Sequence, residues 1–193
     1  DIGPYTISLI INKNAAQTEL RDYNQVVDYN SEITISNLST YPGYDYKGYS
    51  IFENGTESSA AIKNEATTFA DIKFTLTSNT IVDLYFTGKT VNIAYELNNG
   101  TVASANKATY VVDKQAQSFE LVQPTKVGYT FSNWSVTLPN GASGVSVSEN
   151  TVNIAGSTYA EFTLVANWTE NPYTITLHVN GGETSKSDYP TGH

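Results

Sequence analysis

The chain has 193 residues, of which 10 are basic and 19 acidic, so its formal net charge is −9. Such an acidic chain cannot neutralise many phosphates, so we expect no nucleic-acid partner, and because it has no cysteine, thiol nucleophiles, disulfides and thiolate metal sites are excluded. The length fits one large domain or two small ones, and no apolar run approaches the ~18 residues that a membrane-spanning helix needs.

The N-terminal part of the chain is predicted to be rich in strands. Residues 4–9 read PYTISL, an alternation of apolar and polar side chains that is typical of a strand with one buried face. The run Ala15–Tyr23 has fair helix propensity, although its apolar periodicity is poor. We therefore expect a mainly β fold, with a β-rich α+β fold as the alternative.

A tyrosine-rich segment, YPGYDYKGY, occupies residues 41–49. We interpret Gly43–Tyr46 as carrying two additional residues that the second half of the chain lacks, and we assign Tyr49 to the core. Exposed tyrosine rings stack on sugars or anchor protein partners at small entropic cost, so Tyr44 and Tyr46 are the candidate residues for binding a glycan or a host-cell protein. In the alternative interpretation, both rings lie over the surface of their own module.

The second half of the chain carries clear strand and turn signals. Val91–Leu97 alternates apolar and polar side chains, and Asn99 and Gly100 are predicted to supply the positive φ angles of a tight turn after it. The closing segment Phe162–Trp168 alternates in the same way. We expect one face of each strand to be buried.

Several segments occur twice in the same order, at offsets of about 80 to 88 positions, and repetition at a fixed period indicates a repeat architecture. The matched pairs are VVD at 26–28 with 111–113, GYSI at 48–51 with GYTF at 128–131, and FTL at 74–76 with 162–164. PYTISL at residues 4–9 returns as PYTITL at residues 172–177.

The repeats predict three parts of the chain: a divergent module in residues 1–88, a second module in residues 89–170, and the first strand of a third repeat plus a tail in residues 171–193. The joint at residues 87–89 is short, so neighbouring modules are expected to be restrained in relative orientation.

The second module carries motifs that resemble a known family. The strand at residues 91–97 is followed by NNGT, by QPTKVGYTFSNW at residues 123–134, and by FTLVANWT at residues 162–169. This pattern resembles the Listeria–Bacteroides repeat, a family that includes the B-repeat of internalin-type surface proteins. The resemblance implies a small β-grasp-like module, found in tandem on bacterial surface proteins and linked to adhesion or spacing, without catalysis and without a cofactor.

Both halves depart from that family pattern. Asn133 stands where the family usually has glycine before its first tryptophan. In the first half, the alignment by the GYSI match places Asn54 opposite Trp134. Residues 1–88 are therefore interpreted as a divergent copy.

Catalytic and metal sites find little support in the residue pattern. A glycosidase needs two carboxylates across a cleft, which small repeat modules rarely form. The acids nominated for such a pair are Asp22, Asp28, Glu53 and Glu57. Residues 28–32 come nearest to a calcium loop, but they fit a polar turn better. A Ser-His-acid triad lacks a suitable base, because the only histidines are His178 and His193.

We therefore expect an extracellular, non-catalytic repeat segment of a bacterial surface protein, cut from a larger chain, that acts as a stalk or spacer and takes part in adhesion. Its expected partners are neighbouring repeats of the same chain, with no metal, no cofactor and no membrane insertion. One alternative is a glycan- or host-protein-binding module that uses Tyr44 and Tyr46, and a remote one is an accessory part of a secreted hydrolase.

Two further features stay open at the level of sequence. Intramolecular Lys–Asn cross-links require a buried lysine, asparagine and acid in contact, which sequence alone does not reveal. The strand Tyr173–Val179 could add to an exposed sheet edge of the chain. Residues after Glu183 are expected to form a frayed tail.

Overall fold

The computed structural model describes residues 5–13, 17–21, 26–55, 62–176, 178 and 181. Strands make up 51% of the structure and helix 1%, which confirms the mainly β fold. The fair helix propensity of Ala15–Tyr23 does not produce a helix over its described residues, because Gln17–Arg21 forms strand β2 and pairs antiparallel with β1 (Tyr5–Lys13). A full ladder with β1 outweighs the weak helix propensity of this segment.

The strands up to Gly88 form what we call module 1 (residues 5–88). After β1 and β2 they are β3 (Val26–Val27), β4 (Glu32–Ile35), β5 (Tyr44–Phe52), β6 (Asn64–Glu65), β7 (Ile72–Thr75) and β8 (Thr80–Gly88), with the 3-10 turn η1 (Glu53–Gly55) after β5. The main sheet has the order β2-β1-β8-β5-β6, with β3 also paired to β1, and β4 pairs with β7 in a separate ladder.

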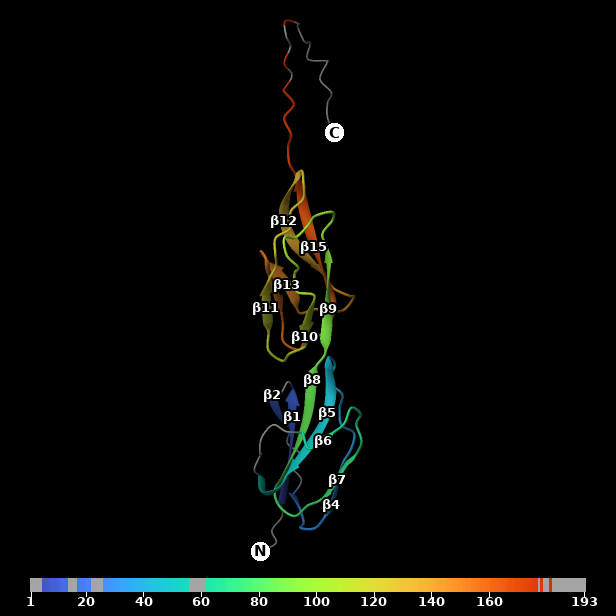
Figure 1. Cartoon of the computed structure of the whole chain (residues 1–193). Coiled ribbons are helices and arrows are strands. Elements are labelled where there is room, and N and C mark those ends of the chain that lie inside the picture. The colour runs from blue at the N-terminus through green and yellow to red at the C-terminus, as the bar shows by residue number, and fades with distance from the viewer. Residues whose placement is uncertain are drawn as a thin grey trace.

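The strands from Thr90 onward form module 2 (residues 90–170). They are β9 (Thr90–Glu96), β10 (Thr109–Val111), β11 (Gln117–Glu120), β12 (Tyr129–Thr137), β13 (Val145–Ser148), β14 (Thr151–Ile154) and β15 (Phe162–Glu170). They build one sheet of order β10-β9-β15-β12 and another of order β11-β14-β13. Among the described residues no sheet combines strands of both modules, and Figure 1 shows the modules end to end.

Both modules follow the same plan around their last strand. The last strand is parallel to the first one (β8 to β1, β15 to β9) and antiparallel to the strand that carries the aromatic motif (β5 or β12). The aromatic strand has a register shift at the same point, between Tyr46 and Gly48 in β5 and between Phe131 and Asn133 in β12. The two modules are therefore copies of one topology.

The core of each module consists of the alternate side chains of these central strands. On β15 the buried apolar residues are Phe162, Leu164 and Ala166, as the alternation of Phe162–Trp168 predicts, and on β8 they are Val82, Leu84 and Phe86. Aromatic pairs complete the core at matching places: the ring centroids of Tyr46 and Phe86 are 5.4 Å apart, and those of Phe131 and Trp168 are 5.6 Å apart. Each such pair adds about 0.5–1.5 kcal/mol beyond its buried area.

The strand register changes the alignment of the two modules. Tyr46 lies opposite Phe86 just before the bulge of β5, as Phe131 lies opposite Trp168 just before the bulge of β12. The segment GYDYKGY at residues 43–49 therefore corresponds to GYTFSNW, which begins at Gly128. Module 1 thus contains the aromatic motif in full.

Two sequence-based interpretations are wrong in consequence. Gly43–Tyr46 carries no additional residues, and the counterpart of Trp134 is Tyr49 rather than Asn54, because Tyr49 lies opposite Leu84 as Trp134 lies opposite Ala166. The short identity between GYSI and GYTF misled the alignment. Register in a sheet depends on which residues face the core, and a short match cannot report this.

In the same alignment Gly48 of module 1 corresponds to Asn133 of module 2. The surroundings of the two residues explain why one is a glycine and the other is not. Gly48 has φ +124°, and a Cβ there would overlap the backbone carbonyl of Asn64 on β6. In module 2, β12 pairs only with β15 among the described residues, so Asn133 has room for a side chain. Module 1 therefore retains the glycine that the family resemblance expects before the last aromatic residue.

The turn after β9 lies one residue earlier than predicted. The positive φ angles belong to Asn98 (50°) and Asn99 (66°), and the Gly100 N–H donates to the Leu97 carbonyl at 2.9 Å. Gly100 is still required, because a Cβ there would overlap the Trp168 ring. The Asn98 amide reaches back to the Ala166 carbonyl at 3.0 Å and holds the turn against β15.

The chain beyond β15 leaves the second module. The described residues after Glu170 form no strand, so the predicted addition of Tyr173–Val179 to a sheet edge is wrong for residues 173–176. Both Tyr173 and Ile175 are exposed, since no sheet face covers them. The tail expected after Glu183 lies outside the described residues.

The contrast between Gly48 and Asn133 gives a first prediction. Gly48→Ala should lower the free energy of unfolding of module 1 by at least about 1–2 kcal/mol, because it combines a strained positive φ with a backbone overlap. Asn133→Ala, the matched change in module 2, should stay within ~0.5 kcal/mol. Urea titration followed by hydrogen exchange measures each module separately, and equal effects of the two changes would contradict this explanation.

Candidate functional site

Tyr44 and Tyr46, the residues proposed to bind a ligand, both lie in the core of module 1. Each is only 7% exposed. The Tyr46 ring stacks on Phe69 with centroids 4.4 Å apart, and it also contacts Phe86. Strand alternation turns Asp45 outward between them. The expectation that both rings are exposed is therefore wrong, since β5 belongs to the main sheet instead of an inserted loop.

Burial also affects the acidity of three core tyrosines. It raises the pKa of Tyr46 to about 12, with a smaller contribution from Tyr49, and burial raises the pKa of Tyr95 and Tyr110 to about 12. Two of these hydroxyls donate to backbone carbonyls: Tyr95 to Lys107 at 2.7 Å and Tyr110 to Ala160 at 2.8 Å. All three phenols stay neutral at physiological pH, and those of Tyr95 and Tyr110 act as hydrogen-bond donors.

The structure describes two of the four carboxylates nominated for chemistry, and it buries neither of them. Asp28 and Glu53 are exposed, and Asp22 and Glu57 lie outside the described residues. The described part of the chain holds no cluster of three or more metal-ligating side chains. It also holds no helix long and apolar enough to cross a membrane.

One buried carboxylate was missed by the sequence analysis. Asp83 is buried on β8 and accepts a hydrogen bond from the Tyr85 hydroxyl at 3.2 Å. It lies on the strand face opposite to Val82 and Leu84. Alternation in TIVDLYF predicts a polar residue on that face but does not predict its burial.

Backbone hydrogen bonds join the residue between the modules to both of them. A single residue, Lys89, separates β8 from β9, and Figure 1 shows one strand leading into the other. The Lys89 N–H donates to the Gly43 carbonyl of module 1 at 2.8 Å, and its carbonyl accepts from the Val112 N–H of module 2 at 2.9 Å. We call this arrangement the Lys89 clamp.

Side chains of module 2 pack closely around the Lys89 clamp. Gly43 has φ +80°, and a Cβ there would lie 2.7 Å from Cβ of Tyr159 and 3.0 Å from Cγ1 of Val112. Val112 is fully buried at this contact. On the other side, a Cβ on Gly88 would overlap the Val112 carbonyl. Two glycines thus allow the modules to approach backbone to backbone.

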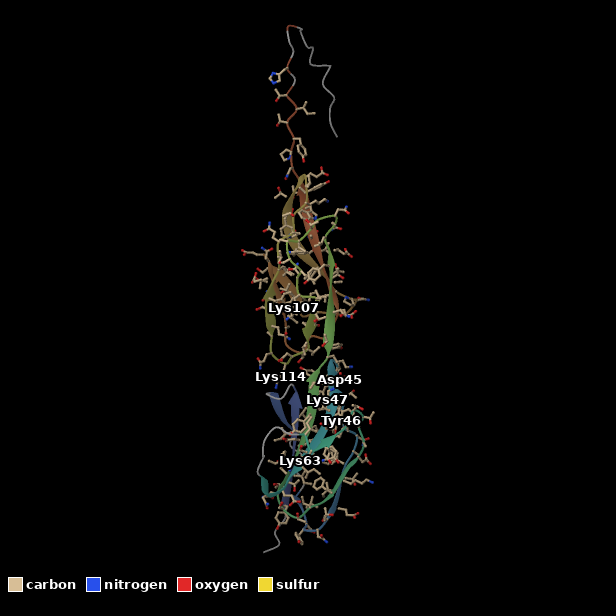
Figure 2. All side chains as sticks on the ribbon, viewed as in Figure 1. Asp45, Tyr46, Lys47, Lys63, Lys107 and Lys114 are labelled. Atoms are coloured by element: carbon tan, nitrogen blue, oxygen red, sulfur yellow. The ribbon has the colours of Figure 1, made fainter. Side chains whose placement is uncertain are left out.

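An ion pair spans the outside of the same joint. The Lys89 ammonium lies 3.5 Å from the Asp45 carboxylate, and both side chains are about half exposed (53% and 54%). Figure 2 labels Asp45 on β5, beside Tyr46 and Lys47. Exposed pairs of this kind contribute at most about 1 kcal/mol, so the backbone contacts carry more of the orientation.

The restraint at residues 87–89 agrees with the short joint in the sequence. The sequence did not predict which three residues meet at this joint. Gly43, Val112 and Tyr159 lie far apart in the chain and meet only at the joint. One signal was available: Gly43 and Gly128 each precede a tyrosine at the start of the aromatic motif. With the correct alignment, these glycines become the matched residues of the two modules.

The described residues thus form two small β modules that are separated by the single residue Lys89. Comparison with family models matches residues 92–166 to the Listeria-Bacteroides repeat domain, which confirms the resemblance for module 2. This repeat is found in surface proteins, and its family is associated with bacterial surface or secreted proteins. Comparisons with curated proteins and with solved structures found no match.

The burial of Tyr46 can be tested directly. Tyr46→Ala should lower the free energy of unfolding of module 1 by about 3–5 kcal/mol, as large-to-small changes in aromatic cores do. The adjacent, outward-facing Asp45→Ala should change it by less than ~1 kcal/mol. Near-ultraviolet circular dichroism and urea titration report the loss, and a Tyr46→Ala chain of unchanged stability would refute the core assignment.

The raised tyrosine pKa values predict alkaline sensitivity. Above pH 10 the tyrosines of the unfolded chain lose protons, whereas Tyr46, Tyr95 and Tyr110 in the folded chain hold theirs to about pH 12. The folded state then binds more protons than the unfolded state, so the free energy of unfolding falls as pH rises from about 10 to about 12. Urea midpoints from pH 8 to 12 measure this, and Tyr46→Phe should flatten the fall for module 1.

Proposed function

We propose that this chain is a non-catalytic spacer segment of a bacterial surface protein that holds successive modules in a defined orientation. The observation that carries the proposal is the packing across the joint, where Val112 and Tyr159 of module 2 lie against Gly43 of module 1, with the Lys89 clamp between them. A flexible linker would leave these groups to water and let the modules rotate. Repeats that contact only their neighbours form extended rods, which suits projection away from a surface.

The surface location rests on the family of module 2, whose members are associated with surface or secreted proteins. The acidic, cysteine-free composition is compatible with that location. Adhesion is part of the proposal only as a secondary role. The alternative of a ligand site at Tyr44 and Tyr46 is not favoured, because neither ring is available to a partner without unfolding β5.

The spacer proposal predicts that orientation depends on Gly43. Because the chain has no cysteine, single cysteines introduced at exposed Thr34 of module 1 and Ser146 of module 2 can carry spin labels at unique sites. Double electron–electron resonance should give a narrow distance distribution between the labels. Gly43→Val should broaden it, because the added side chain meets both Tyr159 and Val112.

The matched control is Gly141→Val. Gly141 also has φ +80° but has nothing within 4 Å of a Cβ, so the change introduces similar backbone strain without a steric overlap at the joint. It should leave the distance distribution narrow. A distribution that is already broad in the unaltered chain would refute a spacer of defined orientation. Strong binding on a glycan array or to host cells would instead favour the binding-module alternative.

A further inference from the structure

Three Asn-Gly pairs lie within the described part of the chain, at residues 54–55, 99–100 and 140–141. In such a pair the backbone nitrogen of the glycine can attack the side-chain carbonyl carbon of the asparagine, because glycine has no Cβ to shield its nitrogen. A C–N bond forms and closes a succinimide ring. The side-chain nitrogen leaves as ammonia and takes the proton of the attacking N–H. Water then opens the ring to aspartate or isoaspartate.

A folded chain permits this reaction only under two conditions. The glycine N–H must be free of an internal hydrogen bond, because it loses its proton when it attacks. The asparagine side chain must also be able to rotate until its carbonyl carbon meets the glycine nitrogen at a distance and angle close to those of the reaction. The three pairs differ in how well they meet these conditions.

The pair Asn140–Gly141 meets both conditions. It forms the centre of the turn after β12, which the Ala142 N–H closes by donating to the Pro139 carbonyl at 3.0 Å. Gly141 has φ +80°, as the third residue of a type II turn does. Within the described residues its own N–H has no hydrogen-bond partner, and both members of the pair are exposed. A Cβ on Gly141 would meet nothing within 4 Å, so no neighbouring group obstructs the Asn140 side chain.

The pair Asn99–Gly100 has the same sequence and fails the first condition. The Gly100 N–H donates to the Leu97 carbonyl at 2.9 Å and is therefore not available to react. The Trp168 ring packs so closely on Gly100 that a Cβ there would overlap it. Attack by the Gly100 nitrogen would require the loss of this hydrogen bond and a movement of the turn away from the ring.

The pair Asn54–Gly55 is restrained at its first residue. The Asn54 N–H donates to the Ser78 hydroxyl at 2.9 Å, in the loop before β8. The φ and ψ angles of Asn54, 62° and 20°, lie in the left-handed region, so its backbone is fixed in a narrow conformation. We therefore expect Asn54 to react more slowly than Asn140.

We propose that Asn140 is a modification site of the folded chain, at which asparagine converts spontaneously to isoaspartate and aspartate, while Asn99 is protected by its turn. Water is the only co-reactant. The modification is independent of the spacer function, since it depends on the turn between β12 and β13 and on no contact across the joint.

The modification changes both the charge and the main chain of this turn. Ring opening replaces a neutral amide with a carboxylate. The turn and residues 155–160 line a cavity of about 610 Å³ in which none of the lining residues is charged. Isoaspartate also adds a methylene to the main chain between residues 140 and 141. The hydrogen bond from Ala142 to Pro139 spans this position, so the longer main chain should break it.

The test is to age the full chain at mildly alkaline pH and to follow each asparagine by peptide mapping and mass spectrometry. An isoaspartate-specific methyltransferase identifies the isoaspartyl product. We expect Asn140 to react at least about tenfold faster than Asn99, because the Gly100 N–H must first give up its hydrogen bond and its packing. In the aged chain the Ala142 amide should lose hydrogen-exchange protection, whereas the Gly100 amide should keep it.

The same chain unfolded in urea is the matched control. Without the turns, Asn140 and Asn99 should react at similar rates, because each is then an asparagine before a glycine in a flexible chain. Asn140→Gln should remove the fast reaction, since its longer side chain forms the ring less readily, and should leave the slow reaction at Asn99 unchanged. Equal rates at the two residues in the folded chain, or a ratio no larger than in urea, would overturn the assignment of Asn140.

Discussion

The parallel pairing of the first and last strands is the constraint from which the rest of the architecture follows. Because β1 and β8 run in the same direction, the chain enters a module at one end and leaves it at the other. The same holds for β9 and β15. An antiparallel pair would return the chain to the end where it entered. Successive modules must therefore lie end to end, as Figure 1 shows.

Packing around the Lys89 clamp turns this direction into an orientation. The Lys89 N–H continues the β5–β8 ladder and its carbonyl continues the β9–β10 ladder, so each bond fixes one peptide group to one module. The contacts that cross the joint are those of Gly43 with Val112 and Tyr159, and rotation of one module against the other would separate them. The contact uses main-chain atoms and two glycines, and it therefore tolerates changes of the surrounding side chains. The side chains after the two modules differ accordingly: Asp45 forms an ion pair with Lys89, whereas the Thr130 hydroxyl donates a hydrogen bond to the Asn171 side chain.

Much of the strand content was predictable, because alternation reports a buried face directly. The burial of Phe162, Leu164 and Ala166 follows from it. The register of module 1 was not predictable by the same means, since GYSI matches GYTF in letters while Tyr46 takes the place of Phe131 in space. The exposure assigned to Tyr44 and Tyr46 depended on that alignment and failed with it. The joint was predicted only as short, because contacts among Gly43, Val112 and Tyr159 require the folded modules.

The joint between the two modules brings two unlike surfaces together. Module 1 contributes the surface around Gly43, and module 2 contributes the surface around Val112 and Tyr159. A contact between two unlike surfaces leaves one surface of each kind uncovered. At Gly43 this contact is complete, whereas Val127, Tyr173 and Ile175 stay exposed at the other end.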